Sequence, residues 1–292
     1  MNKFDRRRKY WLILDCETAT LPAACKYDND PIMKQKVSIA KPLIYDLGWT
    51  VVDAQGRIYT RQNFLIAETF SNPVVFNTAY YKDKRPGYIE KIAMGETRVV
   101  MWEEAIGELL NDMAQCEAVG AYNSMFDFKK ALPFTDLYIS KVYAPDFADW
   151  MEYQNKIMDN IAHGDTRENE KEFEPDVFRF RGQVFPLFDV WGLACKHILN
   201  CDEYKSMCKD NGWVTASGKY YKTSAETAFR FVNYEEDFQE AHTALEDALI
   251  ESILFAEICK RTKKKFEMGI IYFPFRELGT VEDFVLNVRG VM

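Results

Sequence analysis

The stretch WLILDCETAT, residues 11–20, decides the fold that we expect for this chain. With Tyr10 before it, the stretch begins as a continuous apolar run, which is typical of a central strand covered on both faces. The run ends at Asp15 and Glu17, and an extended backbone turns residues two apart to the same side. Two carboxylates that close repel each other unless a cation or a proton neutralises them. Alone, the pair is more simply interpreted as a strand end followed by a cap for the next turn.

The composition is that of a soluble globular protein with enough residues for a sizeable core. The chain has 292 residues, of which 48% are hydrophobic and 28% are charged. Lys and Arg number 37 against 45 Asp and Glu, so the net charge is −8. This acidic balance argues against a broad basic surface for long nucleic acid, but it permits a local basic groove or a ligand held through metal ions.

The cysteines and the lengths of the apolar runs bear on the cellular compartment in which the protein is expected. Seven cysteines form no C-x-x-C pair with zinc-finger spacing, which favours reduced thiols. The apolar run after the basic start meets Asp15 too soon for a signal-peptide core, and no run is long enough to span a membrane. We therefore expect a cytoplasmic protein with no membrane partner.

The pattern of elements predicts an α/β or α+β protein. Three leading strands are expected at residues 10–14, 43–53 and 57–68, with DAQG as the turn between the last two. A helix over 99–116 precedes a strand at 117–122. The segment GAYNSMFDFKKALP then predicts a strand, a turn and a short helix that stops at Pro133.

The second half of the chain alternates strong and weak patterns. Residues 153–184 are charged and lack apolar periodicity, so they are expected to be an insertion. A strand should run into a helix near Asp189, and 200–222 should be irregular. The last strong helix follows Thr243, with a stripe of apolar residues at helical spacing. That stripe consists of Leu245, Leu249, Ile253 and Ala256.

Two further acids lie where helices should begin. Asp127 falls in the first turn of a helix capped by Asn123 or Ser124, and Asp247 follows the capping-box sequence from Thr243 to Glu246. Either acid could simply stabilise its helix by about 0.3–1 kcal/mol, through its interaction with the positive end of the helix dipole. His242 stands just outside the later helix, where the positive end of the dipole favours a neutral imidazole that can accept a proton.

Together these residues resemble the three motifs of the DEDDh (DnaQ-like) 3′–5′ exonuclease superfamily. The matching motifs are Asp15-x-Glu17-Thr18, Asn123-x-x-Phe126-Asp127 and His242-x-Ala244-x-x-Asp247. They occur in the family's order on the expected elements, and the overall look is similar to phage or bacterial members. Tyr122 departs from the pattern, because many members carry histidine there.

The resemblance implies a ribonuclease H-like fold, a mixed five-stranded sheet flanked by helices. The exonuclease domain would span residues 9–261, with the charged insertion at about 153–184 and a C-terminal extension at 262–292. The oligomeric state stays open, and a homodimer is one option.

The resemblance also implies a metal-dependent 3′–5′ exonuclease that releases 5′-mononucleotides from DNA or RNA. Asp15, Glu17, Asp127 and Asp247 would hold two Mg²⁺ or Mn²⁺ ions, and His242 would take the proton of the attacking water. The substrate would be a single strand or another 3′ end. Three positions of the same motifs would contact it: Thr18, Asn123 and Phe126.

Two other functions use some of the same features. A catalytically silent module that binds nucleic-acid ends or protein could keep this fold, although it would have no physical need of His242. A glycoside hydrolase could use paired acids, but without metal and without the spacing from His242 to Asp247.

Overall fold

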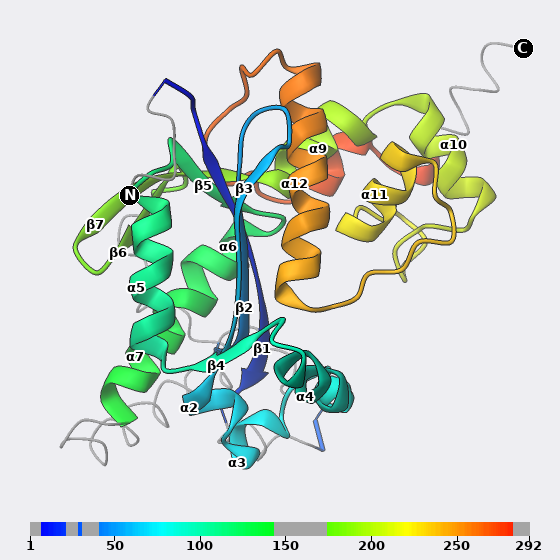
Figure 1. Cartoon of the computed structure of the whole chain (residues 1–292). Coiled ribbons are helices and arrows are strands. Elements are labelled where there is room, and N and C mark those ends of the chain that lie inside the picture. Colours follow the sequence, from blue (N-terminus) through cyan, green and yellow to red (C-terminus); the bar gives the residue numbers. More distant parts are fainter. Residues whose placement is uncertain (1–6, 22–28, 31–40, 143–173, 283–292) are drawn as a thin grey trace, which may run out of the picture.

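The chain forms a mixed seven-stranded sheet flanked by helices, as the computed structural model in Figure 1 shows. The structure describes residues 7–21, 29–30, 41–142 and 174–282. The strand order is β4-β3-β2-β1-β5-β7-β6. The strands are β1 (Trp11–Thr20), β2 (Pro42–Val52), β3 (Ile58–Ile66), β4 (Arg98–Val100), β5 (Ala118–Ala121), β6 (Val177–Phe180) and β7 (Gln183–Asp189). The predicted α/β class is confirmed.

The strand directions place β1 in the interior of the sheet. It pairs antiparallel with β2 and parallel with β5, while β2 pairs antiparallel with β3 and β5 pairs parallel with β7. The expected turn between β2 and β3 is present, with the Gly56 amide donating to the Asp53 carbonyl at 2.9 Å. The outer strands β4 and β6 pair with β3 and β7.

Five strands were expected, and the two additional ones are the sheet edges. β4 and β6 have only three and four residues, too few for a clear alternation in the sequence. β4 occupies the beginning of the segment that was predicted to be helical from residue 99. β6 lies in the last part of the predicted insertion, of which residues 153–173 fall outside the described residues.

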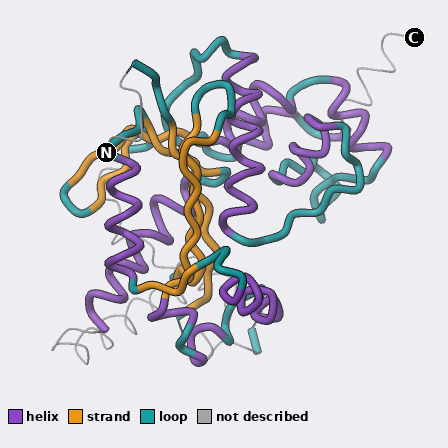
Figure 2. Tube along the Cα trace, viewed as in Figure 1, coloured by secondary structure: helices purple, strands orange, loops and turns teal. Residues whose placement is uncertain are grey.

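The helices alternate with these strands or follow them. They are α2 (Ala67–Phe70), α3 (Pro73–Phe76), η2 (Lys82–Lys84), α4 (Arg85–Ala93), α5 (Trp102–Met113), α6 (Ser124–Phe126), η3 (Asp127–Ala131), α7 (Leu132–Val142), α9 (Val190–Ala194), η5 (Cys195–Leu199), α10 (Asp202–Asp210), α11 (Ala225–Asn233), α12 (Ala244–Arg261) and η6 (Pro274–Leu278). In Figure 2 the strands run through the middle, with helices on both sides.

Two helical predictions were wrong. Pro133 does not stop a helix, because it is the second residue of α7, which continues directly from the π-helical segment η3. The segment 200–222 is not irregular throughout, because it contains α10. The strand that runs into a helix at Asp189 is confirmed: this residue is the N-cap of α9 and accepts a hydrogen bond from the Gly192 amide.

The alternation along β1 divides the core into two clusters, one on each face of the sheet. Leu12, Leu14 and Cys16 belong to the first cluster, whereas Trp11 and Ile13 belong to the second. Buried side chains of α12 lie in the second cluster. Since residues of a strand alternate between faces, the residues at 15 and 17 turn toward the side of α12.

The segment after α12 packs back on the sheet. The Gly269 amide donates to the Leu187 carbonyl at 2.8 Å, and the Ile270 amide donates to the Pro175 carbonyl at 3.0 Å. The predicted C-terminal extension therefore begins as part of the packed structure. Within the described ranges, no helix is long and apolar enough to cross a membrane.

Candidate acidic site

β1 supplies the first two carboxylates of the site. Asp15 and Glu17 are partly buried in the middle of β1, which continues beyond them to Thr20 instead of ending at the acids. The pairing of β1 with β2 shifts register between Glu17 and Thr18, so that the strand is irregular directly after the second acid. Asp15 lies opposite Gly48 of β2 in the ladder.

Gly48 allows the start of α12 to lie directly on the sheet. A Cβ atom at this position would lie 2.3 Å from the Leu245 nitrogen and 2.4 Å from the Ala244 carbonyl carbon. Real Cβ atoms do not approach backbone this closely, so a side chain here would displace the helix. The absence of a side chain at Gly48 therefore fixes how near the first turn of α12 comes to β1 and β2.

Asp46 of β2 caps α12 across a long sequence separation. Its Oδ2 accepts the Ala244 amide at 3.0 Å and the Tyr88 hydroxyl at 2.9 Å, and its Oδ1 accepts the Asn63 side-chain amide at 2.6 Å. Burial raises the pKa of Asp46, and these three hydrogen bonds lower it. The buried carboxylate thus ties the helix start to β2.

The predicted capping box is only partly confirmed. Thr243 is the N-cap residue of α12, as expected, but in the described structure its side chain does not accept a backbone amide of the helix. Its hydroxyl instead donates to the Glu246 carboxylate. The Lys91 ammonium lies 2.9 Å from the same carboxylate, which draws Glu246 away from the backbone.

The apolar stripe predicted for α12 is not its buried face. Ile253 is 42% exposed, whereas Leu254, Phe255 and Ile258 are buried. Asp247 and Glu251 lie one helical turn apart on the buried side, with 8% and 3% exposure. The helix therefore turns two acids toward the sheet, a placement that apolar periodicity does not reveal.

Glu251 is the site residue that the sequence analysis missed. Its Oε2 accepts the backbone amide of Tyr122 at 3.0 Å, which connects α12 to the end of β5. Burial raises its pKa well above the ordinary value, and the neighbouring Asp127 and Asp247 add to the effect. Its spacing of four residues from Asp247 was the one available signal.

Asp127 reaches the site from the segment after β5. It begins η3, a π-helical turn, and it is 3% exposed. The Cys16 thiol donates to its Oδ1 at 3.0 Å. Asn123 is the N-cap residue of α6 and its carbonyl accepts the Asp127 amide at 3.2 Å, so Asp127 lies in the first helical turn, as predicted.

His242 has an unusual backbone conformation and lies beside Glu17 of β1 and Asp247 of α12. Its backbone φ is +51°, in the left-handed region that non-glycine residues rarely adopt. Its ring stacks on Tyr81 with centroids 4.5 Å apart, and Nδ1 lies 3.8 Å from the Glu240 carboxylate. Burial lowers the pKa of His242, and Lys84 lowers it further. Both effects favour the neutral imidazole, against a smaller opposing effect of Glu226.

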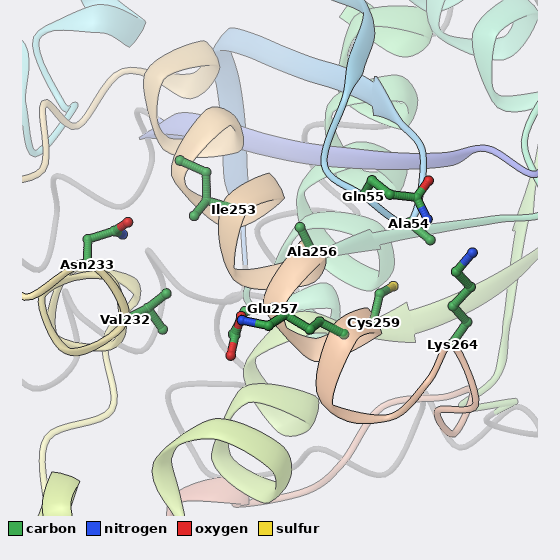
Figure 3. A pocket seen from close by; sticks show the side chains of 10 residues that line it. Ala54, Gln55, Val232, Asn233, Ile253, Ala256, Glu257, Cys259 and Lys264 are labelled. Carbon is green, nitrogen blue, oxygen red and sulfur yellow. The ribbon is translucent and has the colours of Figure 1, made fainter.

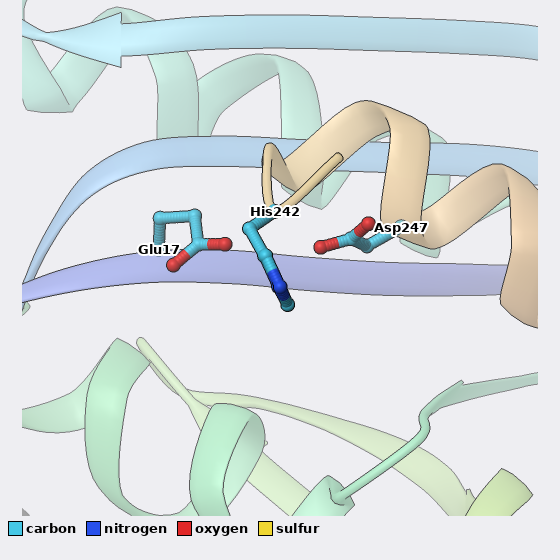
Figure 4. Close-up of side chains that lie close together, drawn as sticks. All are labelled: Glu17, His242 and Asp247. Carbon is cyan, nitrogen blue, oxygen red and sulfur yellow. The ribbon is translucent and has the colours of Figure 1, made fainter. Parts of the chain in front are cut away.

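Three of the predicted residues form a group with the geometry of a metal site. One ligand atom each of Glu17, His242 and Asp247 lies within 4.8 Å of the others. Figure 4 shows the two carboxylates pointing toward each other, with the imidazole between them in this view. Asp247 Oδ1 is buried and has no hydrogen-bond partner among the described residues. An unpartnered buried carboxylate oxygen fits a divalent cation, because such cations prefer oxygen ligands.

Asp15 and Asp127 lie outside that group of three but act on it electrostatically. Burial raises the pKa of Asp15 well above its ordinary value, and Glu251, Asp127, Asp247 and Glu17 each raise it further. Burial and Asp247 raise the pKa of Glu17 to about 9, and burial raises that of Asp127 to about 7. Burial and Glu240 raise the pKa of Asp247 to about 8.

The three predicted substrate contacts lie in different environments. Thr18 is partly buried after the shift in register, and Asn123 is exposed at the turn after β5. Phe126 is partly buried against the first core cluster. These placements leave Asn123 as the most accessible of the three.

A surface groove elsewhere on α12 is separate from the acids. It has a volume of about 620 Å³ and is lined by Gln55, Val232, Ile253 and Glu257, among others (Figure 3). Glu257 is ten residues beyond Asp247, which corresponds to about 15 Å along a helix. Neither His242 nor any acid of the site lines the groove.

A comparison with models of protein families and with curated proteins finds no match. The functional conclusion accordingly depends on the residues and their geometry.

Proposed function

We propose that this protein is a metal-dependent 3′–5′ exonuclease with a ribonuclease H-like fold. The observation that carries the proposal is the convergence of Glu17, His242 and Asp247 around the unpartnered Oδ1 of Asp247. Asp15 is partly buried and Asp127 is buried, and both interact electrostatically with acids of this group. Five side chains from the three motifs thus gather at one place.

The central strands support the proposed fold. The order β3-β2-β1-β5-β7, with β2 antiparallel to its neighbours and β5 parallel to β1, is compatible with the ribonuclease H-like sheet that the motifs imply. β4 and β6 would then be additions at the edges. The acids occupy β1, the segment after β5 and the start of α12.

The proposed reaction is hydrolysis of the terminal phosphodiester bond. Two Mg²⁺ or Mn²⁺ ions would neutralise the phosphate oxygens, lower the pKa of water and stabilise the leaving oxygen. Asp15, Glu17, Asp127 and Asp247 would hold these ions, and this would relieve the repulsion that raises the pKa of Asp15. The many raised pKa values fit a site that is stable only when protons or cations neutralise it.

His242 would accept the proton of the attacking water. Its Nδ1 lies 3.8 Å from the Glu240 carboxylate, and in this proposal Nε2 accepts the proton. The water oxygen forms a bond to phosphorus while the bond from phosphorus to the 3′ oxygen of the preceding nucleotide breaks. The released nucleotide carries the 5′ phosphate, and the shortened strand keeps a 3′ hydroxyl after its oxygen takes a proton from solvent. Stacking on Tyr81 keeps the imidazole in place for this transfer.

The remaining motif residues would select the chain end. Thr18, next to Glu17 on β1, would contact the terminal 3′ hydroxyl, and Asn123 and Phe126 would contact the nucleotide beside Asp127. The natural substrate would be a single strand or a 3′ end of DNA or RNA. An enzyme that holds a few terminal nucleotides requires few phosphate contacts, which is compatible with the net charge of −8.

The direct test follows one strand from both ends. The same single-stranded DNA, and an RNA of the same sequence, is labelled at the 5′ end in one reaction and at the 3′ end in another. With Mg²⁺ or Mn²⁺ we expect a ladder of shortened 5′-labelled strands and immediate release of the 3′ label as a mononucleotide, both abolished by EDTA. A 5′ label released as a mononucleotide, or full-length strands under every condition, would contradict the proposal.

A further inference from the structure

The segment between β3 and β4 forms one wall of the acidic site. This β3–β4 excursion, defined here as residues 67–97, contains α2, α3, η2 and α4. Figure 1 shows α4 beside the first turn of α12, and the ion pair of Lys91 with Glu246 connects these two helices. None of the three motifs includes a residue of this excursion.

Two side chains of the excursion reach the residues around His242. Tyr81 stacks on the imidazole with an interplanar angle of 13°. The Lys84 ammonium donates a hydrogen bond to the Ala241 carbonyl, directly before His242, and lies 4.8 Å from the centroid of the Tyr81 ring. Lys84 thus holds a positive charge at the edge of the acidic cluster.

The charge of Lys84 acts on the acids themselves. It lowers the pKa of both Glu17 and Asp247, against the stronger effect of burial, which raises them. Its side chain is only partly buried, so water and ligands can reach it. A lysine ammonium has three donors, and the hydrogen bond to Ala241 uses one of them.

We infer that Lys84 binds a backbone phosphate of the substrate strand beside the acidic site. This inference rests on the proposed exonuclease function and names a contact that the motifs do not supply. A protein with a net charge of −8 repels a polyanion. The acids Glu17, Asp15 and Asp247 add to this repulsion where a nucleic-acid strand approaches the site. The Lys84 ammonium at this edge offers the phosphate a compact positive charge.

A different role for Lys84 makes a different prediction. If its hydrogen bond to Ala241 served only to position His242, its loss would lower kcat and leave the salt dependence of substrate binding unchanged. A phosphate contact instead contributes to KM, or to the Kd of a bound strand, and to the slope of affinity against salt. The slope therefore separates the two roles.

The test compares three variants with the wild-type protein. Lys84→Met removes the charge and keeps an aliphatic stem against Tyr81, while Lys84→Arg keeps the charge. Lys82→Met removes the same charge from an exposed position of the same turn, η2, and controls for net charge. Hydrolysis of single-stranded DNA with Mg²⁺ gives kcat and KM, and fluorescence anisotropy with Ca²⁺ in place of Mg²⁺ gives Kd from about 50 to 200 mM salt.

We expect Lys84→Met to raise KM and Kd about tenfold and to reduce the salt slope by about 0.7, the contribution of one single-strand phosphate. Lys84→Arg should restore both values, and Lys82→Met should resemble the wild type. An unchanged slope in Lys84→Met would overturn the inference, whether or not kcat falls. A wild-type protein that binds the strand without cleaving it would refute the exonuclease function alone, because the slopes of the variants would still be measured.

Discussion

Replacing Gly48 by alanine tests whether the close packing of α12 on the sheet positions Asp247. The new Cβ atom would lie 2.3 Å from the Leu245 nitrogen, and ordinary contact begins at 3.4 Å. The difference, 3.4 − 2.3 = 1.1 Å, must be absorbed by backbone of β2 and α12, because no flexible side chain lies in the way. Asp247, two residues beyond Leu245, moves with the helix start.

A displacement of about 1 Å at a catalytic centre costs about 10²-fold in rate, equivalent to about 2.7 kcal/mol of transition-state stabilisation. We therefore expect Gly48→Ala to lower kcat about a hundredfold in the single-strand assay. Overpacking should also lower the free energy of unfolding by about 1–3 kcal/mol, measured by urea denaturation.

Gly107→Ala provides the matched control, because a Cβ atom there meets nothing within 4 Å and the residue lies in α5, away from the acids. Its kcat should equal that of the wild type, with stability unchanged or raised by about 0.5–1 kcal/mol. If Gly48→Ala folds and retains full kcat, the contact between β2 and α12 does not set the position of Asp247, and the reasoning is refuted.

Three other predictions concern the buried charges. Glu251→Leu leaves the Tyr122 amide without its acceptor, so in EDTA it should unfold about 1–3 kcal/mol more easily than Glu251→Gln, which keeps an acceptor; equal urea midpoints would contradict this. The raised pKa values of Asp127, Asp247 and Glu17, about 7, 8 and 9, mean that the folded state holds protons that the unfolded chain releases at lower pH. Metal-free protein should therefore be most stable in acid and lose stability as the pH rises from about 5 to 9, at about 1.4 kcal/mol per pH unit for each group that titrates. Divalent cations bind the ionised acids, so Mn²⁺ should raise the Tm more at pH 8 than at pH 6, and an equal rise at both values would exclude these carboxylates as ligands.

The residues of the site were predictable from the sequence where local signals mark them. Asp15 and Glu17 end an apolar run, and Asp127 and Asp247 follow residues that cap helices. Each signal lies within a few residues of the acid, and the structure places all four around one region. The five central strands were predictable for the same reason, since their apolar patterns are local.

The rest of the site depends on contacts between distant segments. Asp46 caps α12 from 198 residues away, and no pattern near either residue shows this. Glu251 was missed because it is an acid on the buried face of α12, and apolar periodicity does not identify a buried acid. Tyr81 and Lys84 lie in the β3–β4 excursion, whose position beside His242 follows only from the folded chain.

The central claim is that the clustered carboxylates support hydrolysis from the 3′ end. The most direct measurement is the rate at which wild type and Asp15→Asn shorten a 5′-labelled single strand in Mn²⁺, with the Tm of both metal-free proteins recorded at pH 8. Asparagine has nearly the same size as aspartate and cannot ionise. Burial and four neighbouring acids raise the pKa of the Asp15 carboxyl group, so its ionised form is unfavourable and the variant should be at least as stable as the wild type. We predict a ladder from the wild type and none from Asp15→Asn. Equal shortening by both proteins, or none by either, would contradict the account.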